Sequence, residues 1–251
     1  LTGLDNVDAA SIDDLHISNN LNLSVCEVQS ICSYLSNPNG IVDIYGNKTG
    51  CNSPPEVANA CGSVLPCLPY GNYTFSSQAE IDNFQTNYPD CNDLEGNVAI
   101  YGSDITDLSG LSVVNSIGGY LFIGGTDNLI SLTGLEGLTS IGEYLYIADN
   151  IALINLNGLN NLTSIEGNFE IRTNNALTSL AGLEGLNSIG DLVIGENNAL
   201  TSLTGIDNIN PDSIAGLSIY SNLSLSHCAV KSICDYFTGG GWGNISYNAP
   251  G

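Results

Sequence analysis

Apolar residues recur along this chain in a pattern that repeats about every 24 residues. The clearest marker is the isoleucine of a short strand-like segment, which falls at steps of 23 to 25 residues at Ile100, Ile123, Ile147, Ile171, Ile194 and Ile219. Leucines follow each marker at about three-residue spacing. One such unit has too few apolar side chains to exclude water from both of its faces, so units of this length must stack on their neighbours. The pattern therefore predicts a solenoid of stacked coils.

A polar position follows each marker isoleucine by three residues. Its occupants are Ser103, Thr126, Asn150, Asn174, Asn197 and Asn222. The chain must turn sharply there, so the buried amides and carbonyls of one coil cannot all pair within a sheet. An unsatisfied buried group costs about 1 to 3 kcal/mol, and a short polar side chain from the next coil can satisfy it. We therefore predict that these six side chains form a structural ladder.

The strand and ladder pattern Leu-x-Ile-x-x-Asn, as in residues 145–150, resembles the Leu-x-Leu-x-x-Asn half of the leucine-rich-repeat consensus. The wider phrase, with Leu-x-Gly-Leu and Ser-Ile-Gly, is similar to the receptor L-domain-like repeats of secreted bacterial surface proteins of the Bacteroidota type. The resemblance implies a mainly β, right-handed leucine-rich-repeat solenoid with one parallel sheet and short helical, disulfide-bonded caps. The convex half lacks a helical pattern, so we expect three short sides per coil.

A second period of about 201 residues overlies the first one. Residues 1–35 match residues 203–237 without a gap and are identical at about half of the positions; after a one-residue shift, Ile44 and Asn47 match Ile245 and Asn248. We therefore expect tandem modules in a longer protein. Four regions follow from this division: the last coils and closing cap of one module (1–66), the N-terminal cap of the next (67–96), its solenoid coils (97–225) and the start of its closing cap (226–251).

Capping boxes predict three helices in the caps, because a Ser followed three residues later by Glu can satisfy the free amides of a first helical turn. The pairs are Ser24 with Glu27, Ser53 with Glu56, and Ser77 with Glu80. We expect the third helix to run through Tyr88 and to bury Ile81 and Phe84. Residues 70–75 alternate like an edge strand.

All eight cysteines lie in the predicted caps, which favours disulfide bonds. Eight cysteines permit about 105 pairings in principle. We favour Cys67 with Cys91, and Cys26 and Cys32 with Cys51 and Cys61 in either combination. Cys228 and Cys234 either pair with each other or have partners beyond Gly251. Zinc is disfavoured because no Cys-x-x-Cys pair occurs.

Charge sets the chain apart, with 26 acidic residues against three basic ones and a net charge of −23. Nucleic acid and anionic lipid surfaces are poor partners for such a chain, because its interaction with phosphate is repulsive. No apolar run reaches the roughly 18 residues of a membrane span, so we expect no membrane insertion. Abundant cysteine with little lysine or arginine favours an extracellular or cell-surface location.

The sequence contains no recognisable catalytic constellation, and we expect a non-enzymatic protein. Its two histidines, His16 and His227, fall where the other copy has Ser218 and Val25, so they do not indicate a shared activity. Gly124 and Gly125 are predicted as tight-turn residues. Calcium at Asp104 and Asp127 is a weak alternative to solvated turn carboxylates, because no spacing matches a calcium loop.

The sheet face is the best candidate recognition surface. Side chains alternate along a strand, so the neighbours of each buried isoleucine point outward. The candidate ligand-binding residues on this face are Tyr101, Tyr120, Phe122, Tyr144, Tyr146, Glu170 and Arg172, with Tyr220 farther along. Aromatic rings suit a sugar ring or a packed partner. Cross-strand stacking that only stabilises the sheet explains them equally well.

We expect a tandem module that acts in adhesion or as the structural unit of a surface fibre, because repeated modules raise avidity without new chemistry. Its partners would be neighbouring modules and identical chains. The alternative is a domain that recognises a cell-surface glycan, peptide or protein on the aromatic face. We expect no cofactor other than calcium.

Overall fold

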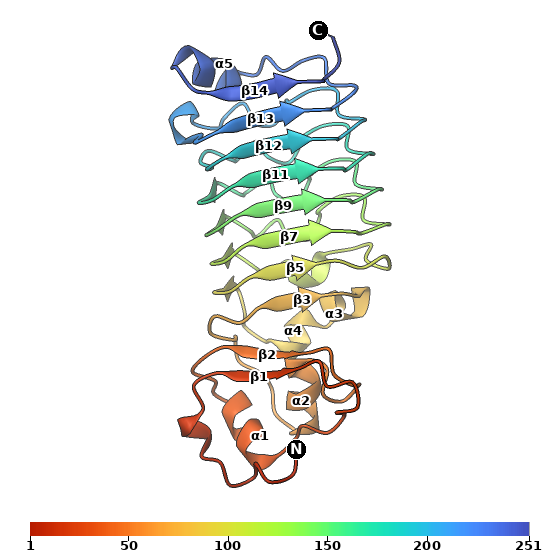
Figure 1. The fold of residues 1–251 in the computed structure, drawn as a ribbon, viewed down its shortest axis with the longest axis vertical. Coiled ribbons are helices and arrows are strands. Elements are labelled where there is room, and N and C mark those ends of the chain that lie inside the picture. Colours follow the sequence, from red (N-terminus) through yellow and green to blue (C-terminus); the bar gives the residue numbers. More distant parts are fainter. Residues whose placement is uncertain (251) are drawn as a thin grey trace.

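An eight-stranded parallel sheet dominates the structure, a computed structural model that describes residues 1–250. Its strands lie side by side along the long axis of the molecule, and the two termini lie at opposite ends of that axis (Figure 1). In spatial order they are β3 (Tyr73–Phe75), β5 (Val98–Ile100), β7 (Leu121–Gly124), β9 (Leu145–Ala148), β11 (Phe169–Arg172), β12 (Leu192–Gly195), β13 (Leu217–Tyr220) and β14 (Gly243–Ser246).

Two smaller parallel sheets accompany the large one, so the prediction of one parallel sheet is wrong. Four two-residue strands form the second sheet: β4 (Asp93–Leu94), β6 (Ser116–Ile117), β8 (Ser140–Ile141) and β10 (Ser164–Ile165). The Ser-Ile corners of successive units pair there because each unit places them at the same point of its path. The third sheet contains β1 (Leu15–Ser18) and β2 (Val42–Tyr45).

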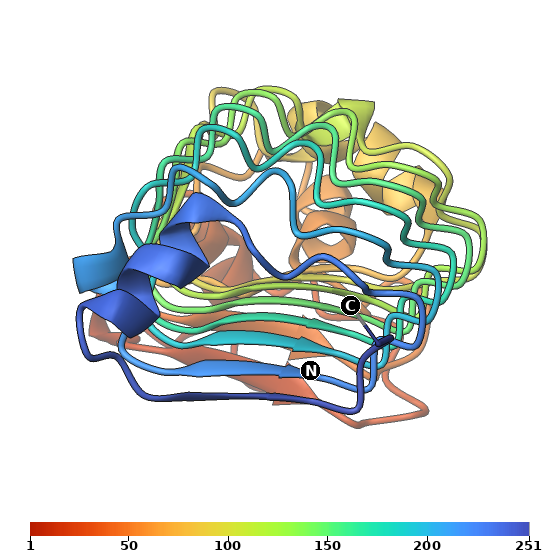
Figure 2. The same ribbon diagram turned by 90° about the horizontal axis from the view of Figure 1, so that it is seen from above.

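Successive units of the chain lie directly over one another (Figure 2). The marker isoleucines Ile123, Ile147 and Ile171 are register partners on adjacent strands, and all three are fully buried. The leucines between the sheets are buried in the same way, in one continuous core. The structure is therefore mainly parallel sheet, with each unit completed by its neighbours.

Short helices lie at the two ends of the stack (Figure 1). They are α1 (Gln29–Leu35), α2 (Pro54–Ala60), α3 (Gln78–Asp82), α4 (Phe84–Asn87) and α5 (Lys231–Thr238), with 3-10 turns η1 (Ala9–Ser11), η2 (Ser109–Leu111) and η3 (Pro211–Ser213). Phe84 is buried against Tyr73 and Phe75, with ring centroids 6.2 and 5.7 Å away. These aromatic contacts close the core below the first strand of the large sheet.

Of the three predicted capping boxes, only the middle one forms, and only in part, because Glu56 Oε2 accepts from Gly50 N and Asn52 N rather than from Ser53 N. Ser53 Oγ accepts a hydrogen bond from Glu56 N at 3.4 Å, at the start of α2. The Ser24 box is wrong: α1 begins at Gln29, because Val28 N donates to Cys26 O and Glu27 turns back to accept from Cys26 N.

The helix predicted from Ser77 through Tyr88 is interrupted. It divides into α3 and α4 at Asn83, whose side chain donates to Ala79 O at 2.7 Å. The predicted edge strand is shorter than residues 70–75, since Tyr70 has a φ of 53° and only Tyr73–Phe75 pair with a neighbour.

Three disulfides fasten the helical ends. Cys67 is joined to Cys91, the pair favoured from sequence, and the open choice among the other four is resolved as Cys26–Cys51 and Cys32–Cys61. Within residues 1–250, Cys228 and Cys234 remain unpaired. Disulfides of this kind are typical of proteins that fold in an oxidising compartment. No helix in the same range combines the length and apolar character needed to cross a bilayer.

A left-handed residue precedes each rung of the polar column, which the sequence pattern did not predict. Asp149, Thr173, Glu196 and Ser221 have φ between 55° and 60°. Their backbone N–H groups donate to the next strand; Thr173 N, for example, donates to Gly195 O at 3.1 Å. Thr is a poor choice for this conformation, since its branched side chain is strained there. Neighbouring coils therefore impose it.

We predict that Leu156→Ala lowers the free energy of unfolding by about 2 to 5 kcal/mol, because it opens a cavity in the continuous core. Leu156 is fully buried. The matched control is Ile154→Ala in the same coil, where the side chain is exposed and a change within about 0.5 kcal/mol is expected. Urea unfolding measures both. Equal losses would contradict the placement of this core.

We predict that Thr173→Gly raises the free energy of unfolding by about 1 kcal/mol, because glycine adopts the left-handed conformation without strain. The reciprocal variant is Gly125→Thr, at the equivalent place two coils earlier, where φ is 64° and an added Cβ meets no atom within 4 Å. It should lose about as much. Thermal and urea unfolding of both variants check the pair; a destabilised Thr173→Gly would show that strain is absent.

Candidate functional site on the large sheet

The sequence singles out two sets of residues, the polar column and the outward face of the large sheet. The polar column is buried in the interior of the molecule. Asn150 Oδ1 accepts from both Thr126 N and Thr126 Oγ1, at 3.2 and 2.6 Å. Asn174 Oδ1 accepts from Asn150 N at 3.1 Å, while Asn174 Nδ2 donates to Ile147 O at 2.9 Å. Each side chain thus joins three coils.

The column is longer at one end and shorter at the other than the six predicted positions. Asn197 and Asn222 continue the same bonds, and Asn248 extends them, with Asn222 N donating to Asn248 Oδ1 at 3.0 Å. Ser103 does not belong to the column: it is exposed, and its carbonyl accepts from Asn128 Nδ2 at 2.6 Å. This column is structural and is not accessible to a ligand.

Two tyrosines stack on the outer face where β7 and β9 begin. The rings of Tyr120 and Tyr144 have centroids 4.7 Å apart and are nearly parallel, at 10°. Tyr144 is exposed and Tyr120 partly so. Desolvation, with smaller effects of Tyr120 and Glu143, raises the pKa of Tyr144. Its hydroxyl therefore remains a hydrogen-bond donor at neutral pH, beside a flat aromatic surface.

A second aromatic pair lies one row farther along the same strands. Phe122 and Tyr146 are register partners with centroids 5.6 Å apart and tilted by 45°. The Phe122 ring lies over Gly124, where an added Cβ would come within 2.8 Å of Phe122 Cε2. Gly124 is thus a strand residue that makes room for a ring, and its prediction as a tight-turn residue is wrong. Gly125, with φ 64°, is left-handed.

A charged pair and a third ring continue the face beyond Tyr146. Glu170 Oε2 contacts Arg172 Nη2 at 3.0 Å, and the Arg172 guanidinium carbon lies 6.0 Å from the centroid of the Tyr220 ring. Tyr220 covers Gly195, where an added Cβ would lie 2.6 Å from Tyr220 Cζ. Arg172 Nε is buried and has no hydrogen-bond partner within the described residues. The guanidinium therefore retains an unused donor.

The structure brings most of the candidate ligand-binding residues together. Phe122, Tyr146 and Glu170 occupy one register row, which Val193 and Ser218 continue. Tyr101 is exposed beyond the end of β5 and stacks on no other ring in the described part of the chain. The sequence did not predict that Gly124 and Gly195 make room for rings, because this role depends on the conformation of the Phe122 and Tyr220 side chains. The position of these glycines two residues after an aromatic residue, or across the sheet from one, was the available signal.

Neither histidine adjoins a nucleophile arranged for catalysis. His16 Nδ1 lies 3.1 Å from Asp43 Oδ2 on the small β1–β2 sheet. His227 Nδ1 lies 2.9 Å from the hydroxyl of Ser226, the residue next to it in the chain. Both histidines are exposed, so neither pair lies in an environment that excludes water.

The weak calcium alternative gains no support from the geometry. Asp104 Oδ2 accepts from Gln78 N at 3.2 Å, and Asp127 is exposed. Within residues 1–250, no three His, Cys, Asp or Glu side chains gather as metal ligands would.

An open groove of about 330 Å³ crosses the corner of the small four-stranded sheet, lined by Ser116, Ser140, Gly142 and Glu166 among others. Its shallow, polar character makes it a poor ligand site beside the aromatic face, because specific pockets bury most of a ligand against apolar surface.

Comparisons with protein-family models, curated proteins and solved structures found no match to this chain.

We predict that Asn174→Leu lowers the free energy of unfolding by on the order of 3 kcal/mol, because it leaves Asn150 N and Ile147 O buried without partners. The comparison is Asn198→Leu, an exposed asparagine whose Nδ2 donates only to the neighbouring Asn175 side chain. It should change stability by less than about 0.5 kcal/mol. Chemical unfolding measures both; similar effects would contradict the ladder's energetic role.

Proposed function

We propose that this chain is part of a tandem array of disulfide-capped, right-handed solenoid modules of the leucine-rich-repeat, receptor L-domain-like type. The array would belong to an extracellular or cell-surface protein of bacterial origin, with no catalytic activity, acting in adhesion or as the structural unit of a surface fibre. The recurrence of residues 1–35 at 203–237 carries the proposal, because it repeats a coil together with its closing helix.

The shape of the molecule supports a role that spans distance. Strands follow one another along the long axis, and the termini lie at its two ends (Figure 1). Each added unit therefore lengthens the molecule without changing its cross-section (Figure 2). Both adhesion and fibre building require a chain that carries tension between its ends. The disulfides favour an oxidising exterior, where such a protein would work.

We predict that tension applied to the two ends unwinds the coils one after another. The marker spacing is 23 to 25 residues, which corresponds to about 80 Å of extended chain per coil. Steps are expected because stability is approximately a sum of nearest-neighbour terms. Optical-tweezer extension over repeated cycles measures the steps and the recovery. A chain that does not rewind after unloading would not serve as a load-bearing unit.

The Cys67→Ser, Cys91→Ser double variant is the matched control. These cysteines are 24 residues apart, so losing their bond should release about a further 80 Å of chain at the N-terminal cap. The coil steps should keep their length. Unchanged total extension would place the bond outside the load path.

A second candidate function is recognition of a neutral glycan or a peptide on the aromatic face. The stacked Tyr120–Tyr144 pair favours it, because it forms a flat aromatic surface in which Tyr144 is exposed and Tyr120 partly exposed. The partly exposed Arg172 side chain, paired to Glu170, lies on the same face. Anionic glycans are disfavoured, since the chain carries a net charge of −23.

We predict that Tyr120→Ala with Tyr144→Ala reduces binding to any glycan that a glycan array identifies by about tenfold, since two lost ring contacts of about 0.5 to 1.5 kcal/mol each reach the roughly 1.4 kcal/mol of a tenfold change. The control is Tyr70→Ala, an exposed tyrosine in the N-terminal cap. Isothermal titration calorimetry gives both affinities. Binding that survives in the double variant, or fails equally in the control, would exclude the aromatic face as the site.

A further inference from the structure

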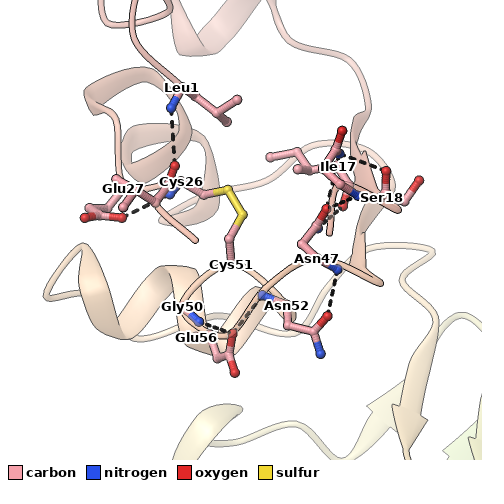
Figure 3. Close-up of a disulfide and its surroundings, with 12 residues drawn as sticks. Leu1, Ile17, Ser18, Cys26, Glu27, Asn47, Gly50, Cys51, Asn52 and Glu56 are labelled. Atoms are coloured by element: carbon pink, nitrogen blue, oxygen red, sulfur yellow. Dashed lines mark hydrogen bonds between the residues drawn. A yellow bond between two sulfur atoms is a disulfide. The ribbon is translucent and has the colours of Figure 1, made fainter. Parts of the chain in front are cut away.

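The two copies of the closing segment differ in what covers them. In the first copy, residues 47–65 return along α1 and β2, and α2 packs against both. Two disulfides, Cys26–Cys51 and Cys32–Cys61, fasten this return; the first is drawn in Figure 3. In the second copy, α5 and β14 take the places of α1 and β2.

The side chains that face the coil stack are equally buried in both copies. Ile31 and its counterpart Ile233 are each 2% exposed. Tyr34 and its counterpart Tyr236 are 2% and 6% exposed. The helix of each copy therefore covers its own stack in the same manner.

The side chains on the other side are not equally buried. Leu35 is fully buried, whereas its counterpart Phe237 is 39% exposed. Ile44 is 3% exposed, and its counterpart Ile245 is 40% exposed. The cysteines follow the same division, because Cys26 is fully buried while Cys228 is partly exposed and Cys234 exposed. Within the closing helix and strand, the two copies thus differ at Leu35 and Ile44, which belong to the two elements that α2 packs against in the first copy.

The polar column differs between the copies as well. In the first copy, Asn47 N donates to Asn52 Oδ1 at 2.8 Å, so the returning segment completes the last rung (Figure 3). Asn52 N in turn donates to Glu56 Oε2 at 2.7 Å. The counterpart of Asn47 is Asn248, whose N–H has no acceptor within residues 1–250.

We propose that the outer surface of α5 and β14 is the docking site for one polypeptide segment with the chemistry of residues 47–65. The segment is not residues 47–65 themselves, which the first copy holds. It carries an Asn acceptor, a Cys, a short proline-started helix with an apolar face, and a second Cys ten residues after the first, as Cys51 and Cys61 are spaced.

Its first cysteine bonds to Cys228 and its second to Cys234. Each bond forms by thiol–disulfide exchange with a small-molecule disulfide such as glutathione disulfide. The two protein thiols lose two protons and two electrons, and the oxidant leaves as two thiols. The apolar face of the segment's helix then covers Phe237 and Ile245, as α2, which buries Val57 and Ala58, packs against α1 and β2 in the first copy.

A synthetic peptide of residues 46–66 tests the proposal when added to the whole chain in a glutathione redox buffer. We expect one peptide per chain and two bonds, from peptide Cys51 to Cys228 and from peptide Cys61 to Cys234, seen by non-reducing mass spectrometry with peptide mapping. The control peptide keeps both cysteines in place and scrambles the residues between and around them. Equal or unordered linkage of the two peptides would overturn the proposal.

A second measurement separates docking from thiol chemistry. When Cys228, Cys234 and both peptide cysteines are replaced by Ser, calorimetry should still detect binding of the peptide. Adding Phe237→Asp with Ile245→Asp to that chain should weaken the binding by about tenfold. Both side chains are exposed, so the fold is expected to persist, and circular dichroism checks it. Ile154→Asp, at a distant exposed isoleucine, is the matched control. An undiminished affinity would overturn the proposal, as would a Cys228–Cys234 bond or a disulfide-linked pair of chains that forms in preference to peptide capture.

Discussion

No coil in this structure satisfies its own backbone, and this constraint determines most of what surrounds it. The amide of Asn150 donates to the side chain of Asn174 in the next coil, and the carbonyl of Ile147 accepts from the same side chain. The leucines between the rungs are likewise buried only because another coil lies above and below. Hydrogen bonding and apolar burial therefore impose the same register, and a shift of one residue would lose both.

An incomplete coil at either end must be closed by something different from a coil. At the N-terminal end of the large sheet, Phe84 and Tyr88 cover the first strand with aromatic rings, and Cys67–Cys91 fixes the segment that carries them. In the first closing segment, the side chain of Asn52 imitates a ladder rung without being part of a coil. The caps thus supply the same two things that a coil would supply, an acceptor for the last amide and an apolar cover.

The periodic features were predictable from the sequence because they are repeated. The predictions that were wrong concern residues whose structure depends on a single local contact. Asn150, Asn174 and Asn197 follow from spacing alone, whereas Ser103 occupies the same spacing and is exposed. Ser24 has a capping-box sequence, yet Glu27 binds the amide of Cys26, which is held by its disulfide to Cys51. The aromatic face could be located from alternation, but which rings stack, and that they lie over glycines, depends on side-chain conformation.

The acidic composition has a partly structural origin. Glu136, Glu184 and Asp207 each accept a hydrogen bond from the N–H of the glycine two residues earlier, where the equivalent residue of another coil is Asn160. At this position a carboxylate accepts the glycine N–H and stabilises the turn, and the amide side chain of Asn160 accepts the equivalent bond. The outer sheet row, by contrast, contains Phe122, Tyr146, Glu170, Val193 and Ser218, with a single acid that is paired to Arg172. This row of the sheet therefore contributes little of the chain's negative charge.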